Sequence, residues 1–194
     1  MPTRAELASA PERIIELTSE AMYALPLDVQ AGLQLAGAAK RFADLVGRIP
    51  MLGRLAQEQG IGEIGSLQDL GPLLVPHSAY KSYPLSFLEK SQFERLTVWL
   101  NGFTAHDLSG VDASGCQSID DWLDLLDAQT EVRVLHSTGT SGKLSFLPRG
   151  VTEMHIMVKG WRRMFDRYRN EPPRMGAPVE QAPTIFVQYR HGAM

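Results

Sequence analysis

Residues 131–148 read EVRVLHSTGTSGKLSFLP, and this stretch decides the fold class. Up to residue 135, apolar and charged side chains alternate with the period of two that is typical of a strand. A run of serine, threonine and glycine follows, and these residues favour a turn. Residues 144–147, which are apolar except for Ser145, then predict a second strand, which we expect to stop at Pro148 because proline cannot donate to a sheet ladder.

Helical spacing of apolar side chains dominates the sequence before this stretch. Residues 1–65 predict a helical N-terminal region that ends at the glycines of residues 60–65. A helix is expected from Leu85 to about Leu100, and Ser118 is expected to cap another one. After the second strand, we expect a long helix capped by Thr152 and a third strand at residues 184–189. The order predicts a mixed α/β chain.

The turn between the two strands has the chemistry that a polyphosphate requires. Its glycines allow backbone N–H groups to approach an anion closely. Its hydroxyls can donate hydrogen bonds, and a lysine adds a positive charge at the end of the loop. The candidate ligand-binding residues of this loop are Ser137, Thr138, Gly139, Thr140, Ser141, Gly142 and Lys143.

One known phosphate-binding pattern, the Walker P-loop G-x-x-x-x-G-K-[ST], fits the loop poorly. Ser137 occupies the position of its first glycine. Leu144 occupies the position of the hydroxyl that binds magnesium. The chain also continues into a strand, where a P-loop continues into a helix. We therefore do not interpret the segment as a Walker P-loop.

The run STGTSG at residues 137–142 resembles the serine-, threonine- and glycine-rich loop of the adenylate-forming superfamily, written S-[ST]-G-[ST]-[TS]-G. The earlier residues 74–84, with Lys81 and the pair Tyr83-Pro84, look like the segment that precedes this loop in phenylacetate-CoA-ligase-like proteins. The commonest family motif has proline and lysine at the positions of Leu144 and Ser145. The chain therefore resembles most closely the phenylacetate-ligase group and the acyl-protein synthetases of bacterial luminescence.

The resemblance implies a fold and an activity. Residues 66–194 are expected to form the N-terminal part of an adenylation domain, at the start of a doubly wound sheet. The implied reaction is ATP-dependent activation of a carboxylic acid to an acyl-adenylate, with transfer to a thiol of coenzyme A or a protein cysteine. The implied cofactors are ATP and Mg²⁺, with the loop holding the β- and γ-phosphates. His191 is a candidate for the acyl pocket, and no catalytic residue is assigned.

Several elements that the resemblance implies do not occur in the chain, which ends at Met194. These are an aromatic-threonine-glutamate motif for adenine and magnesium, an aspartate for the ribose, and a lysine on a mobile C-terminal domain. We therefore expect a truncated domain that is inactive alone, or one that a second polypeptide completes. The alternative reading is a non-enzymatic, helical interaction module in which the serine-rich segment is a structural turn.

Composition excludes several other classes of function. The formal net charge is -3, so no basic surface for nucleic acid is expected. No apolar run approaches the roughly 20 residues that span a bilayer. Cys116 is the single cysteine, and the five histidines lack metal-ligand spacing, so no metal site is expected. The cysteine usage is typical of a cytoplasmic protein.

Overall fold

The computed structural model describes residues 3–137 and 142–166 of the chain. Its residues fall into two compact units. Among the described residues, the first unit contains residues 3–37 and 152–166, and the second contains residues 38–137 and 142–151. The division falls within α3, between Gly37 and Ala38, and at the start of α8, between Val151 and Thr152.

The first unit is helical throughout its described part. Three buried leucines, Leu7, Leu17 and Leu33, form its core. The first helix starts at a capping box in which Thr3 and Glu6 exchange hydrogen bonds. Its elements are α1 (Arg4–Ser9), the 3₁₀ helix η1 (Pro11–Glu16), α2 (Ser19–Tyr23), the first part of α3 (Leu27–Leu45) and most of α8 (Val151–Asp166).

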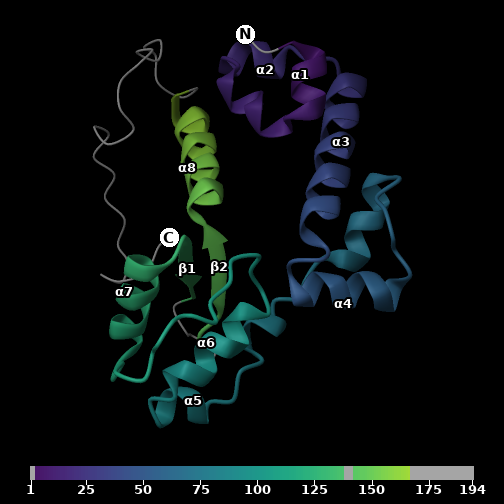
Figure 1. The fold of residues 1–194 in the computed structure, drawn as a ribbon. Coiled ribbons are helices and arrows are strands. Elements are labelled where there is room, and N and C mark those ends of the chain that lie inside the picture. The colour runs from purple at the N-terminus through teal and green to yellow at the C-terminus, as the bar shows by residue number, and fades with distance from the viewer. Residues whose placement is uncertain (1–2, 138–141, 167–194) are drawn as a thin grey trace. The chain divides into compact units, whose positions relative to one another are not determined.

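The second unit contains the predicted hairpin and the helices around it (Figure 1). Two hydrogen bonds fix its early part: Met51 N donates to the Gly102 carbonyl at 3.0 Å, and an Arg48 N–H donates to the Ala105 carbonyl at 3.2 Å. Its helices are the end of α3, α4 (Pro50–Gln59), η2 (Leu67–Leu73), η3 (Ala79–Lys81), α5 (Ser86–Glu89), α6 (Phe93–Asn101) and α7 (Ile119–Gln129).

The helix expected from Leu85 to about Leu100 is two helices, α5 and α6. Ser91 separates them with φ 48°, in the left-handed region. The Gln92 N–H donates to the Phe87 carbonyl at 2.7 Å, and the Ser91 N–H donates to the Leu88 carbonyl at 3.2 Å. These bonds form a Schellman motif, which usually carries glycine at the left-handed position. The prediction was wrong because a serine takes that position here.

Helix α7 begins as the sequence predicted, at a cap on Ser118. The Ser118 Oγ accepts from the Asp121 N–H at 3.1 Å, and the Asp121 carboxylate accepts from the Ser118 N–H at 2.9 Å. This reciprocal pair satisfies backbone donors that the first turn of a helix leaves without partners. The cap also aims the buried side of α7, with Trp122 and Leu126, at the core.

Replacing Ser118 with alanine should lower the free energy of unfolding by about 1 kcal/mol, within a range of roughly 0.5–2 kcal/mol. The reason is that the substitution removes the acceptor of the Asp121 N–H. Urea denaturation followed by far-UV circular dichroism measures the change. The matched control is Ser118→Asp, which retains an acceptor and should stay close to the wild type. Equal midpoints for the alanine variant and the wild type would contradict the capping role.

The two strands, β1 (Val132–His136) and β2 (Phe146–Gly150), pair antiparallel as a hairpin. The second strand lies later than predicted and includes Pro148, opposite Val134. In an antiparallel ladder, hydrogen-bonded and non-hydrogen-bonded pairs alternate. The bond from the Ser137 N–H to the Ser145 carbonyl, at 3.2 Å, fixes that alternation. Pro148 therefore occupies a non-hydrogen-bonded position, where its missing N–H costs the hairpin nothing.

Side chains from α6, α7 and both strands form the core of the second unit. Trp122 is fully buried at its centre, with its ring centroid 5.2 Å from that of Phe146 and 6.3 Å from that of Phe93. Its indole N–H donates to the buried Thr97 hydroxyl at 2.8 Å. That hydroxyl itself donates to the Phe93 carbonyl at 2.8 Å, so the indole N–H and the hydroxyl both have partners in this core.

The prediction of a mixed α/β chain with a helical N-terminal region is confirmed at that level. Within the part of the chain that the structure describes, the sheet consists of β1 and β2. The third strand predicted at residues 184–189 lies outside the described residues. Among the described helices, none combines the length and the apolar character needed to cross a membrane.

Candidate functional site

The serine-rich loop joins the two strands of the hairpin. Two hydrogen bonds between Ser137 and Ser145 close its base. The Ser137 N–H donates to the Ser145 carbonyl, and the Ser145 N–H donates to the Ser137 Oγ at 3.0 Å. Ser145 is buried. Figure 1 shows α6 and α5 at this end of the hairpin and α7 alongside the strands. The described ends of the loop are therefore attached to the core of the second unit.

Gly142 occupies a backbone conformation that requires glycine. Its φ is +81°, and a β-carbon built on it would meet no other atom within 4 Å. The constraint on this position is therefore the backbone dihedral and not the space around it. A branched side chain here would strain the return of the chain into β2.

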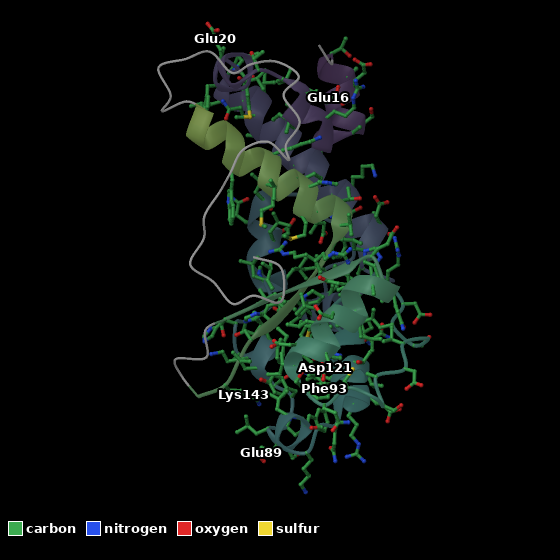
Figure 2. The ribbon with its side chains drawn as sticks, turned by 90° about the vertical axis from the view of Figure 1, so that its left-hand side faces the viewer. Glu16, Glu20, Glu89, Phe93, Asp121 and Lys143 are labelled. Atoms are coloured by element: carbon green, nitrogen blue, oxygen red, sulfur yellow. The ribbon has the colours of Figure 1, made fainter. Side chains whose placement is uncertain are left out.

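Lys143 follows Gly142, and its ammonium group is held at the base of the loop. Its Nζ donates a hydrogen bond to the Tyr83 backbone carbonyl. The same nitrogen lies 4.4 Å from the centroid of the Tyr83 ring, which is a cation–π contact. Figure 2 shows Lys143 where the chain enters β2. Partial burial lowers the pKa of the Lys143 ammonium.

Tyr83 contacts the loop through a third group, its phenol. The hydroxyl donates to the Leu144 carbonyl at 2.9 Å, and the side chain is fully buried. Burial raises the pKa of Tyr83 to about 12. The phenol therefore remains protonated at neutral pH and keeps donating to this carbonyl.

Aromatic rings surround Tyr83 and fix it in place. Its ring centroid lies 5.1 Å from that of Trp99, edge to face, and 5.4 Å from that of Phe146. The Trp99 indole N–H donates to the Ser82 hydroxyl at 3.0 Å. Trp99 also borders a shallow groove of about 390 Å³, whose other lining residues are Pro84, Phe87, Glu94, Arg95 and Val98. The loop base and this groove are therefore neighbours.

Other polar groups near the loop are engaged with the chain itself. The Nδ1 atom of His136 lies 3.3 Å from the Ser137 carbonyl oxygen, so this ring contacts the backbone of the loop. Within residues 3–137 and 142–166, no group of three or more His, Cys, Asp or Glu side chains is placed to hold a metal ion. Cys116 is buried, and burial raises the pKa of its thiol.

Three of the predicted loop residues, Ser137, Gly142 and Lys143, lie in the described part of the chain. They occupy the two ends of the loop, where Ser137 closes the hairpin and Gly142 and Lys143 lead into β2. The remaining predicted residues, Thr138, Gly139, Thr140, Ser141 and His191, lie outside the described residues.

Tyr83 is the residue at this site that the sequence did not identify as functional. It stands 60 residues before Lys143, so no local spacing connects them. In the sequence, the pair Tyr83-Pro84 is only one part of the segment with a family resemblance. The structure brings that segment and the loop into direct contact.

No family model matches the chain, and no match is found among the curated proteins or the solved structures. The resemblance to adenylate-forming enzymes therefore stays an expectation drawn from residues 74–84 and 137–142. The geometry of the loop and of Tyr83 is what bears on function.

Proposed function

We propose that the loop of residues 137–143 binds the β- and γ-phosphates of ATP in an adenylate-forming enzyme that activates a carboxylic acid. In this proposal the chain supplies the phosphate-binding part of an adenylation domain with a doubly wound sheet. The acyl group then passes to a thiol, of coenzyme A or of a protein cysteine.

The observation that carries the proposal is the position of Lys143. Lys143 directly follows a glycine with positive φ. Its ammonium group contacts the backbone carbonyl and the ring of Tyr83. An ammonium group has three N–H donors, and the Tyr83 carbonyl accepts one of them. The other donors can bind an anion in the loop. The Ser137 hydroxyl accepts from the Ser145 N–H and retains its own proton to donate.

The reaction requires charge stabilisation more than covalent chemistry from the protein. A carboxylate oxygen attacks the α-phosphorus and forms a new phosphorus–oxygen bond. The bond from that phosphorus to the bridging oxygen of the β-phosphate breaks, and pyrophosphate leaves with the electron pair. A lysine and donors held in place around the β- and γ-phosphates stabilise the charge that develops on this leaving group. Pre-set donors add to the effect because they need no reorganisation during the step.

Magnesium would reach this loop as a complex with the nucleotide. Mg²⁺ commonly binds through one or two carboxylates together with substrate phosphates, and it helps to neutralise them. The described residues contain no larger cluster of ligands for it. In this proposal, Lys143 and the loop donors act on the phosphates directly.

Replacing Lys143 with alanine should weaken ATP binding by about ten- to a hundredfold. The estimate follows from a charge-assisted hydrogen bond of roughly 1.5–3 kcal/mol. Isothermal titration calorimetry with ATP and Mg²⁺ on the 194-residue chain measures the dissociation constant. The matched control is Lys90→Ala, because Lys90 is exposed at the end of α5, outside the loop.

Two outcomes would contradict the proposal. If the wild-type chain does not bind ATP at millimolar concentration, the loop is a structural turn. The hypothesis of a non-enzymatic interaction module then replaces the hypothesis of an adenylate-forming enzyme. If Lys143→Ala and Lys90→Ala weaken binding equally, the effect is one of overall charge and not of the loop. Because the chain is expected to be inactive alone, carboxylate-dependent exchange of labelled pyrophosphate into ATP tests the reaction itself in a protein that contains the complete domain.

A further inference from the structure

Tyr83 contacts Lys143 and Leu144, on the side of the loop that leads into β2, through three different chemical groups. Its carbonyl accepts from Lys143 Nζ, its ring lies beneath the same ammonium, and its hydroxyl donates to the Leu144 carbonyl. We propose that Tyr83 is the positioning residue of the anion site, which sets the place and direction of the Lys143 ammonium. This inference rests on the proposed function of the loop.

The position of Tyr83 is itself fixed from several sides. The side chain is fully buried between Trp99 and Phe146. Pro84 follows it, and a residue before proline is restricted to extended backbone conformations. Restricting this backbone also restricts the direction of the carbonyl that accepts from Lys143. Tyr83 therefore connects the packed core to Lys143 and Leu144 at the end of the loop.

The chemical consequence concerns the freedom of the lysine. A free lysine side chain has many rotamers and loses them when it binds a phosphate. The contacts with Tyr83 remove much of this freedom before any ligand arrives. The hydroxyl bond to Leu144 fixes the backbone next to the same lysine. Tyr83 is expected to increase affinity by this preorganisation and not by touching the anion.

The first part of the test needs no ligand. Protons above an aromatic ring face are shielded, so the ε-methylene signals of Lys143 should lie upfield of those of Lys90 in NMR spectra. Tyr83→Phe keeps the ring and should keep this shift, whereas Tyr83→Leu should abolish it. A Lys143 signal at the position of the Lys90 signal would overturn the inference, whatever the loop binds.

The second part measures binding of inorganic pyrophosphate by calorimetry. Tyr83→Phe loses the hydroxyl bond to Leu144 and should bind pyrophosphate about two- to tenfold more weakly than the wild type. The matched control is Tyr80→Phe, at a half-buried tyrosine whose ring meets Phe103; it should bind like the wild type. In the Lys143→Ala background, Tyr83→Phe should cause no further loss, because Tyr83 acts through the lysine.

The outcomes separate the two proposals. If the wild type binds pyrophosphate and Tyr83→Phe binds equally well, the positioning role is wrong and the proposed function stands. If Tyr83→Phe weakens pyrophosphate binding by the same factor in the Lys143→Ala background as in the wild type, Tyr83 acts on the fold in general and the inference fails. If the wild type does not bind pyrophosphate, the proposed function fails and the positioning role fails with it. A retained upfield shift then identifies the Lys143–Tyr83 contact as purely structural.

Discussion

Trp122→Ala is expected to lower the free energy of unfolding of the second unit by about 3–5 kcal/mol. The side chain is fully buried, and its removal leaves a cavity between α6, α7 and β2. The substitution also removes the donor that the Thr97 hydroxyl accepts from. Urea denaturation followed by far-UV circular dichroism measures the loss, because that signal does not depend on the tryptophan itself.

Val98→Ala is the control for this prediction. Val98 lies on α6 next to Thr97, but its side chain is 76% exposed. Surface substitutions of this kind usually change stability by no more than about 0.5 kcal/mol. Similar losses for the two variants would mean that the core is not where the structure places it.

Phe146→Ala should cost a similar amount, about 3–5 kcal/mol. Phe146 is the first residue of β2, is fully buried, and meets the rings of both Tyr83 and Trp122. It therefore anchors the end of the hairpin that carries the loop. Arg149→Ala, at an exposed position of the same strand, is the control and should change stability little. Chemical denaturation measures both variants.

A double-mutant cycle sharpens this second prediction. The edge-to-face contact between Trp122 and Phe146 should appear as a coupling of about 0.5–1.5 kcal/mol beyond the loss of buried area. The two single losses should therefore sum to more than the loss of the double variant. Strict additivity would show that the rings do not stabilise each other.

The parts of the fold that the sequence predicted are those with local causes. Ser118 and Asp121 are three residues apart, and their reciprocal bonds begin α7 without help from the rest of the chain. The alternation before residue 136 likewise predicted β1. Helix α4 ends at Gly60 with φ 66°, a conformation that glycine adopts readily, and this position lies at the start of the glycines of residues 60–65.

The parts that the sequence did not predict depend on distant contacts or on an unusual residue. Ser91 ends α5 in a conformation that usually belongs to glycine, so the apolar pattern appeared continuous. Pro148 was expected to stop β2, but the register with Val134 makes proline harmless there. The contacts of Tyr83 with Lys143 and Leu144 join residues about 60 positions apart, and only tertiary structure brings them together.

Pro148 also limits the backbone hydrogen bonds that the outer edge of β2 can make. Its position in the ladder turns its backbone away from β1, toward the outer edge of β2. At that point the edge offers a carbonyl but no N–H, so a strand from another chain could not complete a ladder there. On the outer side of β1, both backbone groups of Val132 are already bonded, because its N–H donates to the Thr130 hydroxyl at 3.0 Å and its carbonyl accepts from the Arg133 side chain at 2.9 Å. One imino acid on β2 and two local side chains at β1 thus restrict pairing at both margins of the hairpin.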